Sequence, residues 1–127
     1  MKSSPQKILV VDDEKNIVRL TQMNLERIGY QVITATDGLE AMKAVERECP
    51  DLIVMDITMP HMDGMEVLRT LKSDPLFRPI PIILYSVKAQ DEAINHAALL
   101  GADLFLNKPV EPLELVRCIE GFLGPRD

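Results

Sequence analysis

The chain has 127 residues, 46% of them hydrophobic, and a formal net charge of −6. This length fits one domain that buries a core of its own without disulfides, and the hydrophobic content argues against disorder. The acidic balance, without any run of lysine and arginine, argues against direct binding of nucleic acid, because phosphate contacts require a cationic face.

Two further features bear on the location of the protein. Cys49 and Cys118 stand far apart with no metal-ligand spacing, so we expect two reduced thiols rather than a disulfide. The first apolar run, 8–11, is far too short for a signal peptide or a transmembrane span. These features predict a cytoplasmic protein without a membrane partner.

The first third of the chain alternates apolar runs with an amphipathic stretch. Residues 8–11 predict a strand buried on both faces. A helix is expected from Glu14 to Gly29. The apolar arc of this helix comprises Ile17, Val18, Leu20, Leu25 and Ile28. Residues 30–36 are more polar and predict a strand at the edge of a sheet.

Two helices are expected in the middle of the chain. Asp37 is placed to cap the first of them, with Glu40 three residues on as a capping box, and Pro50 follows its end. This helix would turn Leu39, Met42 and Val45 inward. A buried strand, 52–55, then leads through the loop 57–64 to the next helix. That helix would bury Val67, Leu68 and Leu71.

The last third repeats the alternation. Strands are expected at 80–85 and 102–106, with a helix at 91–100 between them. This helix is rich in alanine, and two interpretations stay open: a weak helix, or a face that shifts between states because it buries little. A final helix begins at Glu111 with Pro112 at its first position. Its inner face would comprise Leu113, Val116, Ile119 and Leu123.

Five βα units in succession predict the α/β class. We expect a doubly wound five-stranded parallel sheet, (βα)5, with helices on both faces. Residues 1–127 would form a single domain with a core of about 7–123.

Charged and hydroxyl residues stand where four of the predicted strands end. They are Asp12, Asp13, Asp56, Ser86 and Lys108. The carboxyl ends of parallel strands meet at one edge of the sheet, so these side chains should converge. Clustered carboxylates repel, and one pKa should rise unless a cation shares the site. Carboxylate oxygens suit Mg²⁺, with Mn²⁺ as an alternative. In isolation, Asp12 and Asp13 would be read as helix-capping acids; the third carboxylate favours the metal site.

With these residues in order, the chain resembles the receiver domain of two-component response regulators, over about 7–123. The matching landmarks are Asp12-Asp13, Asp56, the loop Met59-Pro60-x-Met62-Asp63-Gly64, Ser86 and Lys108-Pro109. The resemblance implies the chemotaxis-regulator type of fold with strand order 2-1-3-4-5. It also makes the bond before Pro109 a candidate cis peptide.

The resemblance assigns a chemical role to each acid. Asp56 matches the phosphoacceptor, which takes a phosphoryl group from a phosphohistidine. Asp13 and Asp56 match direct Mg²⁺ ligands, together with the main-chain carbonyl of Thr58, while Asp12 matches a ligand acting through water. Lys108 would pair with a phosphoryl oxygen.

The resemblance also implies a switch. Ser86 would move toward the phosphoryl group and Phe105 would follow, which alters the surface formed by the fourth helix, fifth strand and fifth helix. Thr58 and Lys88 match positions that flank the attacking water and set the lifetime. Val87 stands where the family usually has a small residue such as alanine. Two interpretations stay open: its side chain narrows access to Asp56, or it turns into the helix layer and is part of the core.

These roles imply a regulatory domain that catalyses only its own phosphorylation and dephosphorylation. Its partners would be a sensor histidine kinase or phosphotransfer protein, and a downstream protein or fused output domain. A phosphorylation-dependent homodimer is a further candidate. Two other functions compete with this one. A phosphohydrolase using an aspartyl phosphate would need an acid where Thr58 stands, and a pseudo-receiver would have a broken site. The cognate kinase, the output and the full length of the protein stay open.

Overall fold

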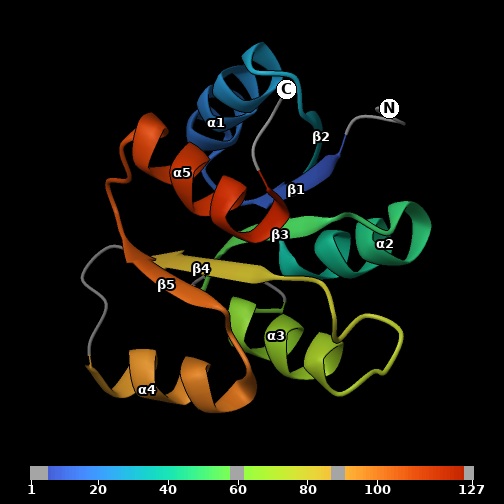
Figure 1. Cartoon of the computed structure of the whole chain (residues 1–127). Helices are drawn as coiled ribbons and strands as arrows, with labels where there is room; N and C mark the ends of the chain where they lie inside the picture. Colours follow the sequence, from blue (N-terminus) through green and yellow to red (C-terminus); the bar gives the residue numbers. More distant parts are fainter. Residues whose placement is uncertain (1–5, 58–61, 87–90, 125–127) are drawn as a thin grey trace.

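A computed structural model describes residues 6–57, 62–86 and 91–124 (Figure 1). Within these ranges, five strands form one parallel sheet: β1 (Lys7–Val11), β2 (Gln31–Ala35), β3 (Leu52–Asp56), β4 (Ile82–Ser86) and β5 (Leu104–Asn107). The helices that follow them are α1 (Lys15–Arg27), α2 (Gly38–Glu48), α3 (Gly64–Lys72), α4 (Asp91–Leu100) and α5 (Pro112–Leu123). The sheet order is β2-β1-β3-β4-β5, which confirms the predicted fold and the edge position of β2.

The sheet separates two hydrophobic cores. Helices α1 and α5 cover one face, and α2, α3 and α4 cover the other (Figure 1). Successive residues of a strand point to opposite faces; in β1, Ile8 and Val10 join the core under α1 and α5, while Leu9 and Val11 join the other. We call these the α1/α5 core and the α2/α3/α4 core. Strands buried on both faces explain the uninterrupted apolar runs.

The strand register brings four strand ends to one edge. Val11 pairs with Met55, Asp56 with Tyr85, and Ser86 with Asn107. The residue that follows β1, the last residue of β3, the last residue of β4 and the residue that follows β5 therefore lie along the same carboxyl edge. This edge carries the candidate site.

The capping of α2 differs in detail from the predicted capping box. The side chain of Asp37 accepts a hydrogen bond from the Glu40 amide at 2.8 Å, as expected. The Glu40 side chain, however, accepts from the amide of Thr36 at 2.8 Å and also from its hydroxyl, one residue before the cap. The reciprocal bond thus orders the end of β2 as well as the start of α2.

Three leucines predicted to be inward are exposed: Leu20 is 58% exposed, Leu39 52% and Leu113 60%. Each lies two positions, about 200° of helical turn, from a residue that faces the sheet: Val18, Ala41 and Leu115. Ile28, the C-cap residue of α1, is also exposed rather than buried. The helices are rotated relative to the predicted arcs.

The alanine-rich face of α4 is lightly buried. Among its described side chains only Ala97 is fully buried, and the helix packs on α3 and β5.

At the opposite edge of the sheet, Lys72 connects α3 to the segment before β4 and to Asp103. Its Nζ donates to the Ile80 carbonyl at 2.8 Å and to the Asp103 carboxylate at 3.1 Å.

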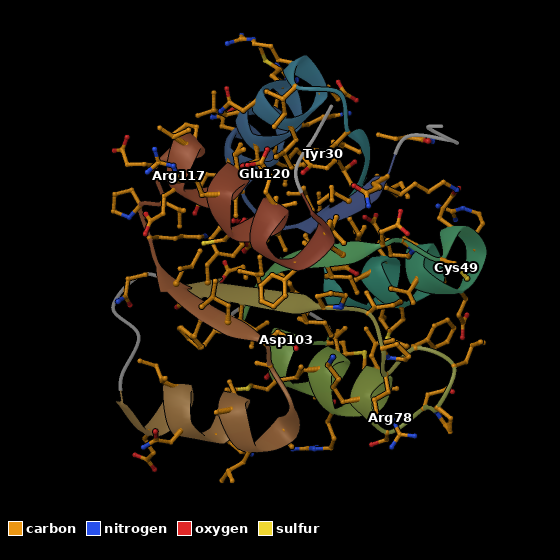
Figure 2. The ribbon with its side chains drawn as sticks, viewed as in Figure 1. Tyr30, Cys49, Arg78, Asp103, Arg117 and Glu120 are labelled. Carbon is orange, nitrogen blue, oxygen red and sulfur yellow. The ribbon has the colours of Figure 1, made fainter. Side chains whose placement is uncertain are left out.

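The remaining sequence predictions concern cysteines and membranes. Cys49 and Cys118 are free thiols, as predicted, and Figure 2 shows Cys49 at the C-terminal end of α2. In the part of the chain that the structure describes, no helix has the length and the apolar content that crossing a bilayer requires.

Candidate functional site

The ammonium group of Lys108, which follows the edge strand β5, lies between two acids of the carboxyl edge. Its Nζ donates to Asp12 Oδ2 at 2.7 Å and to Asp56 Oδ2 at 3.1 Å, and Glu14 Oε1 lies 3.7 Å away. The Lys108 side chain is 7% exposed. Burial alone would lower its pKa, but the hydrogen bonds and charges of Asp12 and Asp56 outweigh burial and leave the pKa of Lys108 raised. The amine is therefore held as a cation between two carboxylates.

Asp12 is fully buried and is held by three donors. Its Oδ1 accepts a hydrogen bond from the Glu14 amide at 2.9 Å. Its Oδ2 accepts one from Lys108 and another, at 2.8 Å, from the hydroxyl of Tyr85. A carboxylate that accepts several charge-assisted or hydroxyl bonds is fixed in orientation. Asp12 thus has little freedom to turn toward a ligand.

Tyr85 is a site residue that the sequence analysis missed. Its ring lies in the α1/α5 core, and Lys108 Nζ stands 4.7 Å from the ring centroid, within the range of a cation–π contact. Burial, together with the charge and hydrogen bond of Asp12, raises the pKa of the Tyr85 phenol, which therefore stays protonated and can donate. Its signal was a phenol in a buried strand, since a buried tyrosine hydroxyl usually needs a partner.

Asp12, Asp13 and Asp56 are grouped as metal ligands would be. Each offers a carboxylate oxygen, and these oxygens lie within 4.8 Å of one another. Opposite ligands of an octahedral Mg²⁺ are about 4.2 Å apart, twice the ion–oxygen distance. The group therefore fits one ion after a small movement, or with one acid acting through water.

Burial distinguishes the three acids. Asp13 is exposed, while Asp56 is 6% exposed.

The charge of the group also suits a metal ion. Three carboxylates and the Lys108 ammonium sum to a formal charge of −2, which a divalent cation would balance. The residues present therefore fit a hard divalent ion in both ligand type and charge.

The predicted switch residues lie on adjacent strands and point to the same face of the sheet: Leu84 pairs with Phe105 in the α2/α3/α4 core, and Ser86 follows Leu84 by two positions. Ser86 ends β4, is buried, and its carbonyl accepts from the Lys108 amide at 2.8 Å. Phe105, in β5, is partly buried against the α2/α3/α4 core. The Lys108–Pro109 peptide bond is cis. Thr58, Val87 and Lys88 lie outside the described residues.

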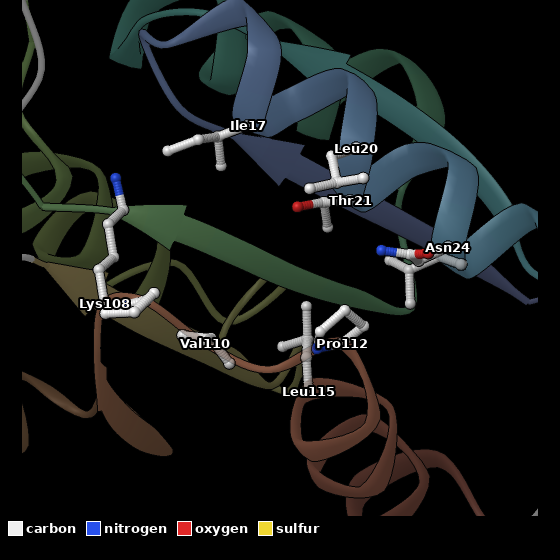
Figure 3. A pocket seen from close by; sticks show the side chains of 10 residues that line it. Ile17, Leu20, Thr21, Asn24, Lys108, Val110, Pro112 and Leu115 are labelled. Atoms are coloured by element: carbon white, nitrogen blue, oxygen red, sulfur yellow. The ribbon is translucent and has the colours of Figure 1, made fainter.

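An apolar cavity opens beside Lys108, between α1 and the segment that joins β5 to α5 (Figure 3). It has a volume of about 180 Å³. Its walls include Ile17 and Leu20 of α1, and Val110, Pro112 and Leu115 on the other side. Figure 3 shows the Lys108 side chain running from this cavity with its amine directed away from Val110 and Pro112. The sequence analysis placed no cavity here, because it assumed that Leu20 was buried.

Comparison with known proteins gives a consistent result. The family model described as the response regulator receiver domain matches residues 8–120. The alkaline phosphatase synthesis transcriptional regulatory protein PhoP of Bacillus subtilis is 46% identical over 118 residues, which are 93% of this chain and 48% of that protein. The response regulator SaeR of Staphylococcus aureus is 38% identical over 116 residues, 91% of this chain and 50% of that protein. The chain thus spans about half the length of the curated relatives it matches.

Solved structures extend the likeness to the fold. The chemotaxis response regulator CheY4 of Vibrio cholerae superposes with a TM-score of 0.87 at 28% identity, covering 94% of this chain and 99% of that one. The receiver domain of the sensor histidine kinase PA1611 of Pseudomonas aeruginosa superposes with a TM-score of 0.86 at 29% identity. The match covers 96% of this chain and 100% of that one. That structure holds a magnesium ion coordinated in its active site cleft.

Proposed function

This chain belongs to the response regulator receiver domain family of two-component signalling, and from that membership we propose that it is a switch activated by phosphorylation of Asp56. The observation that carries the proposal is the position of Asp56. This buried carboxylate lies in the acidic group and accepts a hydrogen bond from the Lys108 ammonium at 3.1 Å. The donor would be the phosphohistidine of a sensor histidine kinase or of a phosphotransfer protein.

The transfer is a nucleophilic displacement at phosphorus. A carboxylate oxygen of Asp56 forms a bond to phosphorus while the bond from phosphorus to the histidine nitrogen breaks. The electron pair leaves with the imidazole, which takes up a proton, and Asp56 becomes an acyl phosphate. Lys108 turns from the carboxylates to a phosphoryl oxygen and forms an ion pair with it.

The acidic group would hold Mg²⁺, or Mn²⁺ in its place, through Asp13, Asp56 and the main-chain carbonyl of Thr58, with Asp12 acting through water. A bound divalent ion supplies neutralisation of the charge that develops on the phosphoryl oxygens. The exposure of Asp13 and the three donors on Asp12 support this division of roles. The related PA1611 receiver domain, whose structure contains magnesium, supports the choice of ion.

Phosphorylation would be read on the surface formed by α4, β5 and α5. Ser86 would move toward the phosphoryl group and Phe105 would turn inward after it, a population shift between two existing states. The light burial of α4 supports this proposal, because an element that buries little apolar surface costs little to rearrange. A downstream protein, a fused output domain or a second copy of the chain would bind this surface.

The phosphodonor protein must cover the carboxyl edge to reach Asp56. The apolar cavity beside Lys108 and the exposed side chain of Leu20 offer it a contact on that side.

We further propose one domain over 1–127 with its core at about 7–123. We also propose a cytoplasmic location, on the ground of family membership.

The domain is regulatory. A phosphohydrolase that works through an aspartyl phosphate would need a second acid two positions after its nucleophile. Thr58 stands there, so no observation favours that alternative. A receiver-like module that works without phosphorylation would be expected to lack part of the acidic group, which is complete here.

Labelling by a small phosphodonor tests the proposal. Incubation with acetyl phosphate and Mg²⁺ should add one phosphoryl group by intact mass, and chelation should suppress the addition. Asp56→Asn should abolish it. Asp51→Asn is the matched control, because Asp51 is exposed, directly precedes the other end of β3, and its carboxylate accepts a hydrogen bond from the Lys7 amide at 2.7 Å. Labelling that persists in Asp56→Asn would refute the assignment.

A further inference from the structure

The hydroxyl of Tyr85 joins the hydrophobic core to the acidic group. Tyr85 is the penultimate residue of β4, and 5% of its surface is exposed. Its ring packs in the α1/α5 core, so its hydroxyl approaches Asp12 from the side of that core and donates to Oδ2 at 2.8 Å. Strand β3 lies between β1 and β4, so this bond spans two strand positions.

Asp12 Oδ2 is shared between two donors of different kinds. Lys108 brings a charge and also serves Asp56, whereas Tyr85 is neutral and serves Asp12. If Lys108 turns toward a phosphoryl group on Asp56, Asp12 loses its cation while it remains fully buried. A buried carboxylate that loses its partner is strongly destabilised. The Glu14 amide continues to donate to Oδ1, but Oδ2 needs a donor of its own while Lys108 leaves.

We propose that Tyr85 is a positioning residue for phosphoryl transfer: its hydroxyl holds Asp12 so that Lys108 is free to move from Asp12 to the phosphoryl group. The proposal rests on the function proposed above and extends it to a residue that touches neither phosphorus nor the nucleophile. Without the hydroxyl, Asp12 would depend on Lys108 for its side-chain partner and would hold the amine back.

Two substitutions separate the hydroxyl from the ring. Tyr85→Phe keeps the aromatic face on which Lys108 rests, 4.7 Å from the centroid, and removes only the donor. Tyr30→Phe is the matched control, because Tyr30 is a second buried tyrosine of the same α1/α5 core. Both variants lose one buried phenol hydroxyl, and only the first loses a bond to Asp12.

The test measures the rate constant of phosphorylation by acetyl phosphate at saturating Mg²⁺. Removing a partner that orients a carboxylate of a metal site typically costs 10–100-fold, and we expect about tenfold for Tyr85→Phe. Tyr30→Phe should react at the wild-type rate. In the Asp12→Ala background, Tyr85→Phe should cause no further loss, because the hydroxyl then has nothing to hold. A structural role alone would give the same fold-change in both backgrounds and would overturn the proposal.

A spectroscopic measurement covers the case in which Asp12→Ala fails to fold. The chain has two tyrosines and no tryptophan, so Tyr85 is the only tyrosine and the main chromophore of the Tyr30→Phe protein. Its near-ultraviolet absorption should shift on phosphorylation, because the hydroxyl becomes the principal side-chain partner of Asp12. An unchanged spectrum in fully phosphorylated protein would overturn the proposal.

The two levels of inference fail in different ways. If the wild-type protein is labelled at Asp56 but Tyr85→Phe is labelled equally fast, the positioning role alone is wrong. If the wild-type protein is not labelled, the proposed function fails and the role of Tyr85 falls with it.

Discussion

One methyl group added at Gly38 should disturb both the fold and the acidic site. Gly38 opens α2, and a Cβ built on it would lie 1.9 Å from the carbonyl oxygen of Met62. Real Cβ contacts essentially never fall below 3.0 Å, so α2 and the segment before α3 must separate by at least 1.1 Å, the difference between these distances. The Met62 oxygen is a backbone atom and a Cβ is fixed to the helix backbone, so neither can swing away as the end of a long side chain could.

The magnitude follows from two opposing effects. Alanine in place of glycine at a helical position stabilises by about 0.5–1 kcal/mol. Forcing extra volume into a packed contact costs about 1–3 kcal/mol. We expect Gly38→Ala to lose a net ~1–2 kcal/mol, which for a domain of this size lowers Tm by roughly 3–10 °C. Ligand distances in a well-formed metal site stay within about 0.2 Å of their ideal values. The segment that follows Asp56 is one of the two that must move, so Mg²⁺ affinity should fall as well.

Thermal and urea unfolding of the metal-free protein and calorimetric titration with Mg²⁺ measure the two effects. Gly121→Ala is the matched control: this glycine lies in α5, is exposed, and a Cβ there would meet no heavy atom within 4 Å. It should gain about 0.5–1 kcal/mol, the opposite sign. If Gly38→Ala were as stable as the Gly121→Ala protein, the close approach of α2 to Met62 would not govern this region.

Three further predictions address the site. In a titration with Mg²⁺, Asp13→Ala should weaken metal binding more than Asp12→Ala does. In unfolding experiments without metal, Asp13→Ala should stabilise the protein because it removes repulsion between carboxylates. Asp12→Ala should instead destabilise the protein, because Lys108 and Tyr85 lose their hydrogen-bond partner. The pKa of Tyr85 is raised in the fold but near 10 in the unfolded chain, so its contribution to stability is present below about pH 10 and declines above it. Urea unfolding across that range should show a shallower decline for Tyr85→Phe, and identical slopes would contradict this. Val87→Ala should speed phosphorylation by a bulky phosphoramidate more than by acetyl phosphate; an unchanged ratio would show that Val87 does not crowd Asp56.

Much of the fold could be predicted because local patterns and tertiary structure agree. The apolar runs are strands buried on both faces, and each stops where a polar residue reaches the carboxyl edge. Gly101 and the pair Glu111–Pro112 gave the end of α4 and the start of α5 correctly. These boundaries depend on short-range chemistry, which the sequence displays directly.

The exposed leucines could not be predicted from hydrophobicity. The buried face of α2, which packs on the sheet, consists of Ala41, Ala44 and Val45. These side chains are small, and Leu39 turns outward. A broad apolar arc is compatible with several rotations of a helix, and only the packed sheet selects one. The same ambiguity misplaced Leu20 and Leu113.

The role of Tyr85 could not be predicted for a different reason. Its partner Asp12 is 73 residues away, on a strand that does not adjoin β4. A tyrosine in an apolar run predicts burial, but the position of its hydroxyl depends on the register of three strands. The acids themselves were easier to place, because each ends a strand or lies within two residues of its end.

The partition of the sheet into two cores has a consequence for how such a protein can diversify. Tyr85 contributes to the α1/α5 core and Phe105 packs against the α2/α3/α4 core, with the sheet between them. Substitutions that share no contacts usually act independently. Changes in α1, which lies outside the proposed α4-β5-α5 surface, can therefore accumulate without altering the side on which Phe105 lies, so a lineage could exchange one upstream partner for another while keeping its response intact.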